Sequence, residues 1–137
     1  MRVKDGIAYL GVIHPPPTPR AGYYDGTVFM IDISNPQAPV ELGVLPSGGY
    51  GWAPLKIELG LDRVYVAYEQ EGLEVYDTTD SSAPARIGSF EPSEPVVSLS
   101  LSGDVIYLYN KSIFMLRYDE AAYLANRAYL PMVNKSP

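Results

Sequence analysis

The sequence predicts an all-β fold made of one antiparallel sheet repeated along the chain. Residues 26–45 (GTVFMIDISNPQAPVELGVL) and 71–90 (EGLEVYDTTDSSAPARIGSF) align without a gap at an offset of 45 residues. Residues 112–118 (SIFMLRY) match the opening of the same segment at an offset of about 40. A repeat of this length built from short strands is typical of β-propellers, in which similar sheets are arranged radially around an axis.

The second unit shows most clearly how one predicted sheet is built. Residues 55–59 (LKIEL) alternate in polarity, which predicts a strand that buries Leu55, Ile57 and Leu59 on one face. Polar turns separate this strand from the next three, so the unit is predicted to be a four-stranded meander, or one blade. These strands are predicted at 63–68 (RVYVAY), 73–77 (LEVYD) and 85–90 (ARIGSF).

The third unit repeats this arrangement. Residues 96–102 (VVSLSLS) alternate, and Val97, Leu99 and Leu101 are predicted to face the core. Residues 119–125 (DEAAYLA) could start a helix, but the repeat length favours a loop there. The remaining strands are predicted at 105–110 (VIYLYN), 113–118 (IFMLRY) and, as the outer strand, 126–133 (NRAYLPMV).

The first unit departs from this arrangement in two ways. Residues 1–4 are all that precede the Asp5-Gly6 turn, so a full-length inner strand does not fit. Residues 12–26 (VIHPPPTPRAGYYDG) are inserted, and because three consecutive prolines cannot feed a sheet ladder, we expect a loop that projects from one face. The chain, 1–137, is therefore predicted to be a single, incomplete propeller of about three blades. Its units are placed at about 1–46, 53–91 and 95–133.

Composition excludes several classes of protein. The 137 residues are 47% hydrophobic, which suits one domain with a sizeable core. The net charge of −6 argues against nucleic acid as a partner. The absence of cysteine excludes disulfides, thiolate metal sites and a cysteine nucleophile. No apolar run reaches the roughly 18 residues of a membrane span, and the N-terminal residues do not resemble a signal peptide.

The carboxylates offer no clear catalytic or metal site. Asp32 and Asp77 share one repeat position, where metal binding is possible, but we expect each to accept hydrogen bonds from the amides of the following turn. The acidic residues between 69 and 80 are predicted to form a solvated surface instead of a glycosidase pair or a calcium site. These residues are Glu69, Glu71, Glu74, Asp77 and Asp80. No metal, cofactor or catalytic residue is predicted.

Five residues are candidates for ligand contact. They are His14, Tyr23, Tyr24, Tyr50 and Trp52. His14 is the only histidine and is followed by three prolines, and nothing in the sequence supplies the orienting partner that a general base needs. The aromatic residues are expected in loops, where tyrosine and tryptophan favour interfaces. Trp52 has an alternative structural role, in which it packs between two blades.

One segment of the sequence resembles a known repeat family. Residues 29–43 (FMIDISNPQAPVELG), preceded by the G-x-A-Y-L strand at 6–10, resemble the LVIVD repeat. The resemblance implies a β-propeller from a secreted or surface-attached protein of bacteria or archaea, and hence an extracellular or cell-surface location. Because that family is defined by its repeat and not by an active site, the resemblance implies no catalytic residue.

The sequence favours a non-enzymatic binding or scaffold module. Its partners would be further propeller blades, from the same parent protein or from another chain, and a possible protein or glycan ligand. The alternative is a fragment of a propeller enzyme, a hydrolase or oxidoreductase, whose central active site needs additional blades. The predicted inner strands at 55–59 and 96–102 offer only Lys56, Glu58 and serines, which favours the binding module. A third possibility is a truncated gene product without an independent function.

Overall fold

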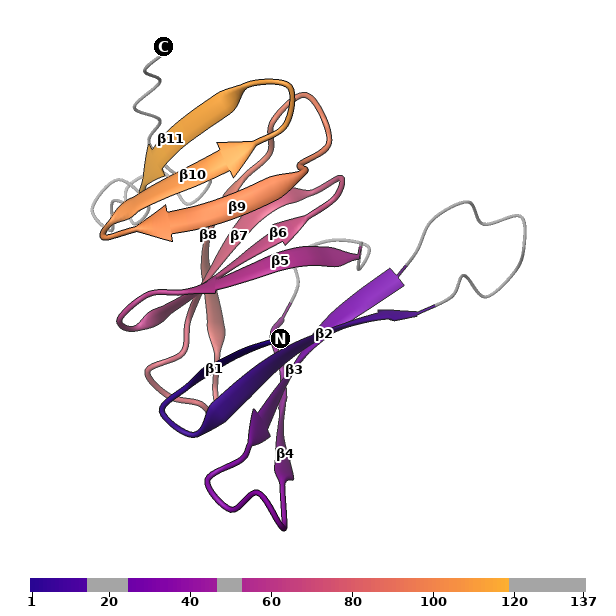
Figure 1. Cartoon of the computed structure of the whole chain (residues 1–137), viewed down its shortest axis with the longest axis vertical. Coiled ribbons are helices and arrows are strands. Elements are labelled where there is room, and N and C mark those ends of the chain that lie inside the picture. Colours follow the sequence, from indigo (N-terminus) through magenta and orange to yellow (C-terminus); the bar gives the residue numbers. More distant parts are fainter. Residues whose placement is uncertain (15–24, 47–52, 119–137) are drawn as a thin grey trace.

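A computed structural model of the chain describes residues 1–14, 25–46 and 53–118, which form three antiparallel sheets with no helix among these residues (Figure 1). The first sheet contains β1 (Arg2–Lys4), β2 (Ile7–His14), β3 (Asp25–Asp32) and β4 (Val40–Val44). The second contains β5 (Pro54–Leu59), β6 (Arg63–Tyr68), β7 (Gly72–Asp77) and β8 (Ala85–Phe90). The third contains β9 (Ser98–Ser102), β10 (Val105–Tyr109) and β11 (Ile113–Arg117). The predicted all-β, propeller-like fold is confirmed.

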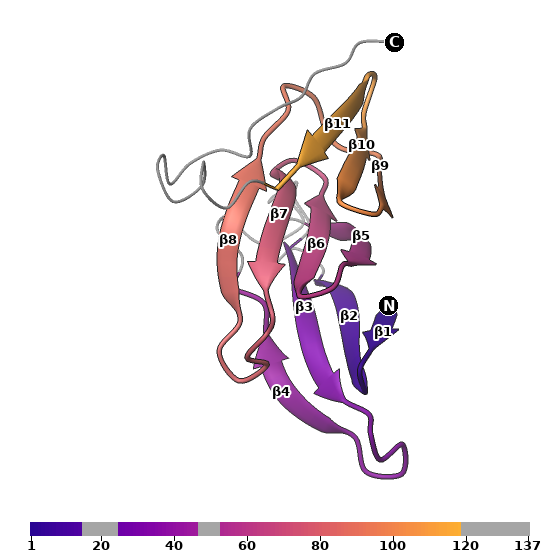
Figure 2. The same ribbon diagram turned by 90° about the vertical axis from the view of Figure 1, so that its left-hand side faces the viewer.

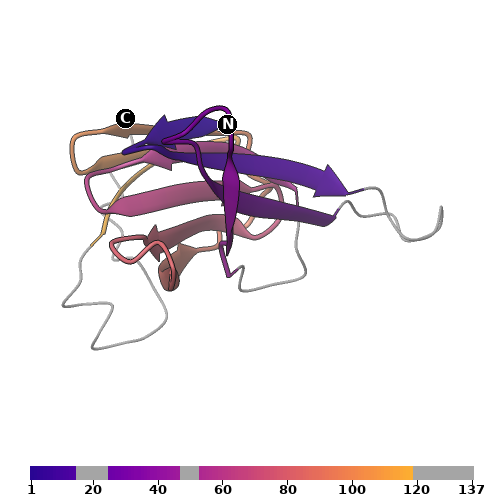
Figure 3. The same ribbon diagram turned by 90° about the horizontal axis from the view of Figure 1, so that it is seen from below.

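The three sheets are arranged as successive blades. Strands pair in chain order within each sheet, and the first strands, β1, β5 and β9, lie along one edge of the molecule (Figure 2). Strand β5 contacts β1 and β2 on one side and β9 on the other. Seen from below, the sheets lie over one another as layers (Figure 3). Within the described residues the sheets do not close into a ring, as expected for an incomplete propeller.

The middle sheet is covered on both faces, which explains its sequence. Along β6, Val64 and Val66 face the first sheet, whereas Tyr65 and Ala67 face the third. A strand buried on both faces is apolar at nearly every position. Strand β6 (RVYVAY) follows that rule, whereas residues 55–59 of β5 (LKIEL) alternate between apolar and charged residues. One hydrophobic cluster therefore lies between the first and second sheets, and another lies between the second and third.

The predicted repeat register is confirmed by a β-bulge that recurs in two sheets. The pairing of β3 with β4 shifts directly after Met30, which pairs with Gly43. The pairing of β7 with β8 shifts directly after Val75, which pairs with Gly88. Both pairs of positions are separated by the 45 residues of the sequence repeat, so the two sheets share strand pairing as well as strand order.

Two residues predicted to be buried are exposed. Leu55 lies where the pairing of β5 with β6 shifts between Pro54 and Lys56, so the alternation begins only after it. Val97 precedes β9, and its neighbour Val96 takes the buried position instead. In both cases the register of the strand end, which the alternating pattern does not reveal, decides which side chain faces the core.

The insertion in the first sheet begins later and ends earlier than predicted. Residues 12–14 extend β2 and residues 25–26 belong to β3, so the prediction of a loop over 12–26 was wrong at both ends. β-branched residues such as Val12 and Thr27, which pair with each other, favour this extended ladder. Residues 15–24 lie outside the described residues, as do the predicted loop at 119–125 and the predicted outer strand at 126–133.

Candidate functional site

The two repeat aspartates close tight turns. Asp32 Oδ1 accepts a hydrogen bond from the Ser34 amide at 2.8 Å. Asp77 Oδ1 accepts one from the Thr79 amide at 2.9 Å and another from the Thr79 hydroxyl at 2.7 Å. Hydrogen bonds from these side chains and amides lower the pKa of both carboxyl groups. The prediction that these aspartates serve the repeat structure is confirmed.

Glu74 departs from the predicted solvated surface. Its side chain is buried, with the residue only 2% exposed, between the first and second sheets. It accepts hydrogen bonds from the Tyr76 hydroxyl and from Arg86 Nη1, the latter at 2.8 Å. The Tyr68 hydroxyl lies 3.3 Å from that of Tyr76. The prediction was wrong for Glu74 because Arg86 lies beside it on the neighbouring strand and supplies the opposite charge that a buried carboxylate requires.

The polar cluster of Glu74, Tyr76, Tyr68 and Arg86 is held together by hydrogen bonds among its own side chains. Burial raises the pKa of the Tyr68 and Tyr76 hydroxyls, which keeps both protonated as hydrogen-bond donors. Among the described residues, no group of three or more histidine, aspartate or glutamate side chains is placed to hold a metal ion. The same part of the chain contains no helix with the length and apolar character of a membrane span.

The structure places one of the five predicted ligand-contact residues. His14 is the last residue of β2 and pairs in the ladder with Asp25. In Figure 1 this end of the β2–β3 hairpin extends away from the other two sheets. The four predicted aromatic contacts, at positions 23, 24, 50 and 52, lie outside the described residues. Ligand contact by these five residues therefore stays a prediction.

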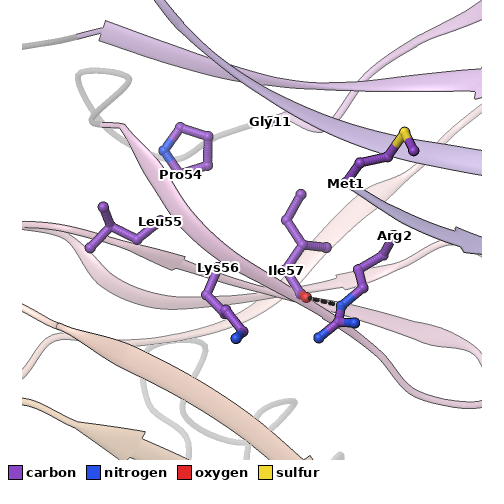
Figure 4. Close-up of a pocket in the computed structure, with 7 residues that line it drawn as sticks. All are labelled: Met1, Arg2, Gly11, Pro54, Leu55, Lys56 and Ile57. Carbon is purple, nitrogen blue, oxygen red and sulfur yellow. Dashed lines mark hydrogen bonds between the residues drawn. The ribbon is translucent and has the colours of Figure 1, made fainter.

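A groove lies between the first and second sheets, with a volume of about 450 Å³ (Figure 4). It is lined by Met1, Arg2, Gly11, Pro54, Leu55, Lys56 and Ile57. Arg2 crosses between the two sheets, with Nε donating to the Ile57 carbonyl at 3.0 Å and Nη2 donating to Glu58 Oε1 at 2.7 Å. Its guanidinium therefore joins the first strands of two adjacent blades.

A close backbone approach shapes this groove. A Cβ at Gly11 would lie 3.0 Å from Pro54 Cγ, so glycine lets β2 approach β5 closely. The groove offers the Lys56 ammonium and the apolar Leu55 side chain to a ligand, but its lining residues include no nucleophile paired with a base.

The first sheet has an apolar face that no described element covers, which we call the leading face. It consists of Leu10, Val12, Phe29 and Ile31, all partly exposed, whereas Ala8, on the same side, is only 3% exposed. Leu10 pairs with Phe29 and Ala8 with Ile31, on the side of the sheet opposite to the cluster shared with the second sheet. Leu10 pairs with Phe29, and Val66 pairs with Glu74, which lies 45 residues after Phe29, so Leu10 corresponds to Val66. Ile31 corresponds to Tyr76 by the same 45-residue offset. Val66 and Tyr76 are 0% exposed because the first sheet covers them, whereas Leu10 and Ile31 are partly exposed.

The third sheet has a second apolar face, which we call the trailing face. It consists of Tyr107, Tyr109, Ile113 and Met115. Tyr107 is 37% exposed, Tyr109 47% and Ile113 50%. The corresponding residues of the middle sheet are buried against the third sheet. They are Tyr65, Ala67, Leu73 and Val75.

Both faces escaped the sequence predictions, although a signal for them exists. The segments IAYLGVIH and VIYLY carry apolar residues at nearly every position. Continuous apolar character is typical of a strand that is covered on both sides. Each of these strands has a described neighbouring sheet on one side, so the pattern indicates a second covering layer.

A comparison with known families matches one repeat of the chain. Residues 23–45, which include β3 and β4, match the model of the LVIVD repeat. The match confirms the resemblance seen in the sequence and supports a repeat module of the propeller type. No curated protein matches the chain significantly.

Proposed function

We propose that the chain is a non-enzymatic binding or scaffold module of a secreted or cell-surface LVIVD-type propeller protein. Its three sheets are blades, and further blades complete the ring. One observation carries this proposal. The leading face presents apolar side chains at the positions that the middle sheet buries against the blade before it.

Burial energetics support the same conclusion. Each Å² of apolar surface removed from water contributes about 25 cal/mol, so covering side chains such as Leu10, Phe29 and Ile31 stabilises the assembly. Ring closure also protects the edges of a propeller, since no blade is then left at an end. A sheet of the same repeat is the natural cover, because its apolar positions recur at the same spacing as those of the first sheet.

The polar groups support a binding role over catalysis. Glu74 is engaged by Arg86 and Tyr76, and the repeat aspartates are engaged by their own turns. A protein or glycan ligand would contact the end of the β2–β3 hairpin at His14, together with the aromatic residues predicted in loops. These aromatic residues are Tyr23, Tyr24, Tyr50 and Trp52.

Appending a blade tests the proposal. A copy of residues 53–97, which contain the middle sheet and its connection to the next, would be joined ahead of residue 1. The added blade should cover the leading face and raise the thermal midpoint by about 5 °C above that of the dilute, unextended chain. The matched control carries Leu10→Lys in the original first sheet, which should remove the gain. An unchanged midpoint, or turnover of hydrolase or oxidoreductase substrates by the extended protein, would contradict the proposal.

Location is tested separately. Antibodies raised against the purified chain should label intact cells of the source organism or its culture supernatant. A signal confined to the cytosolic fraction would contradict a surface or secreted location, while leaving the blade arrangement to be judged by the appended-blade experiment.

A further inference from the structure

We infer that a second copy of this chain occupies both uncovered faces, so that two copies close one ring. The leading face of each copy would pack on the trailing face of the other. This inference rests on the proposed function, because it names the occupant of the faces that the proposed propeller needs to cover. The three sheets formed by the described residues of each copy would make six in the dimer, within the four to eight blades typical of propellers.

A recurring side-chain pair identifies the trailing face as one half of a blade interface. Tyr9 pairs with Met30 across β2 and β3, and both are buried against the second sheet. Tyr107 pairs with Met115 across β10 and β11, at the corresponding positions of the third sheet. The third sheet therefore presents the same tyrosine–methionine pair that already forms a blade interface within the chain, but on a face that no other described sheet covers.

The leading face supplies the other half. In the existing interface, the Tyr9–Met30 pair lies in one cluster with Val66 and Tyr76 of the second sheet. Leu10 and Ile31 hold the corresponding positions in the first sheet. A junction between two copies would thus bring a tyrosine–methionine pair against two apolar residues, at the positions that Val66 and Tyr76 hold in the interface between the first two sheets.

Symmetry favours two copies over an open chain of copies. Two-fold rings are the commonest closed assemblies, and a two-fold axis through the ring makes the two junctions identical. The net charge of −6 on each copy does not oppose this contact locally, because neither face, as defined above, includes an acidic residue. The described residues carry both halves of the junction, so a second copy offers a matching face to each of them.

The mass of the purified full chain in solution tests the inference. Light scattering should give twice the 15.0 kDa of one copy. Leu10→Glu on the leading face and Tyr107→Lys on the trailing face should each weaken dimerisation by at least about 100-fold, because each buries an unpaired charge. The control Leu61→Glu, in an exposed turn at 89% exposure, should leave the dimer intact. Circular dichroism verifies that each variant retains its β-structure.

Mixing the two variants tests which faces meet. One junction of the mixed dimer pairs the unmodified leading face with the unmodified trailing face, and the other pairs glutamate with lysine. The mixture should therefore recover dimers that neither variant forms alone. A lack of recovery would show that like faces meet, and would overturn the inference. So would a monomeric wild-type chain, or open assemblies that grow with concentration.

These outcomes separate the inference from the proposed function. If the chain is monomeric but the appended copy of residues 53–97 still raises the thermal midpoint, the inference of a dimer is wrong and the proposed propeller module is supported. If the appended blade also has no effect, both are wrong.

Discussion

Asp32 and Asp77 occupy the same place in successive sheets. Each is the last residue of the third strand of its sheet, and each accepts a hydrogen bond from the amide two residues further on. The side chain thus satisfies a backbone donor as the chain leaves the sheet. The equivalence shows that the sequence repeat specifies strand ends and turns as well as strand positions.

The turn hydrogen bonds at Asp77 should contribute measurably to stability. Asp77→Ala removes the acceptor for the Thr79 amide and hydroxyl and should lower the free energy of unfolding by about 0.5–1 kcal/mol, since the turn is exposed to water. Asp77→Asn retains a side-chain oxygen and should lose less. Urea denaturation measures both variants. Equal losses would show that the charge, and not the acceptor, supports the turn.

Acid should weaken the folded state through the same group. The hydrogen bonds from Thr79 hold the pKa of Asp77 below its ordinary value of 3.8 in the folded state. The stabilisation from the charged form is therefore fully present above 3.8 and is lost as pH falls through the lower, folded value. Wild-type protein should lose more stability in acid than Asp77→Asn, as urea denaturation across this range would show. Parallel losses would contradict the assignment.

The Glu74–Arg86 pair should be sensitive to the loss of the arginine. Arg86→Met leaves the buried Glu74 carboxylate without its guanidinium partner and should lower the free energy of unfolding by about 3 kcal/mol. The double variant Glu74→Met/Arg86→Met removes both charges and should recover much of that loss. If the double variant is as unstable as the sum of the single variants, the two side chains do not act as a pair.

Alkaline conditions should destabilise the protein through the buried tyrosines. Burial raises the pKa of Tyr68 above its ordinary value of 10.0 in the folded state. The unfolded chain ionises first, so the stabilisation is present below 10.0 and is lost as pH rises above that value. Tyr68→Phe cannot ionise at this position and should lose less stability in alkali than wild type. An alkaline loss identical to that of wild type would exclude Tyr68 as its source.

Two glycines offer a matched pair of stability tests. Gly72 has a φ of +83°, and a Cβ there would lie 2.2 Å from the Phe90 carbonyl oxygen. Gly103 has a φ of +60°, with nothing within 4 Å of a Cβ. Gly103→Ala should lower the free energy of unfolding by about 1–2 kcal/mol through backbone conformation alone, whereas Gly72→Ala adds a steric clash and should lower it further. Thermal unfolding compares them. Equal losses would contradict the close packing at Gly72.

Much of the fold could be predicted because the repeat is written in the sequence. The 45-residue offset aligned Asp32 with Asp77 and Gly43 with Gly88, and the structure confirms both equivalences. Tight turns and alternating strands are local features, so short segments reveal them.

The errors arise where contacts distant in sequence decide the outcome. The bulge at Leu55 depends on how β5 pairs with β6, which alternation alone does not encode. Glu74 was predicted on the surface because its partner Arg86 lies on the next strand, twelve positions away. The two uncovered faces were missed because an apolar strand does not itself reveal which of its sides lacks a neighbour.

Labelling of a single thiol tests most directly whether the leading face is a blade interface. The chain has no cysteine, so Ile31→Cys introduces one thiol on that face. In the chain extended by a copy of residues 53–97, this thiol should react at least about tenfold more slowly than in the dilute, unextended chain. A thiol at the exposed Leu61 position should react equally in both. Equal rates at position 31 would show that a blade does not cover the leading face, and would contradict the propeller module proposed here.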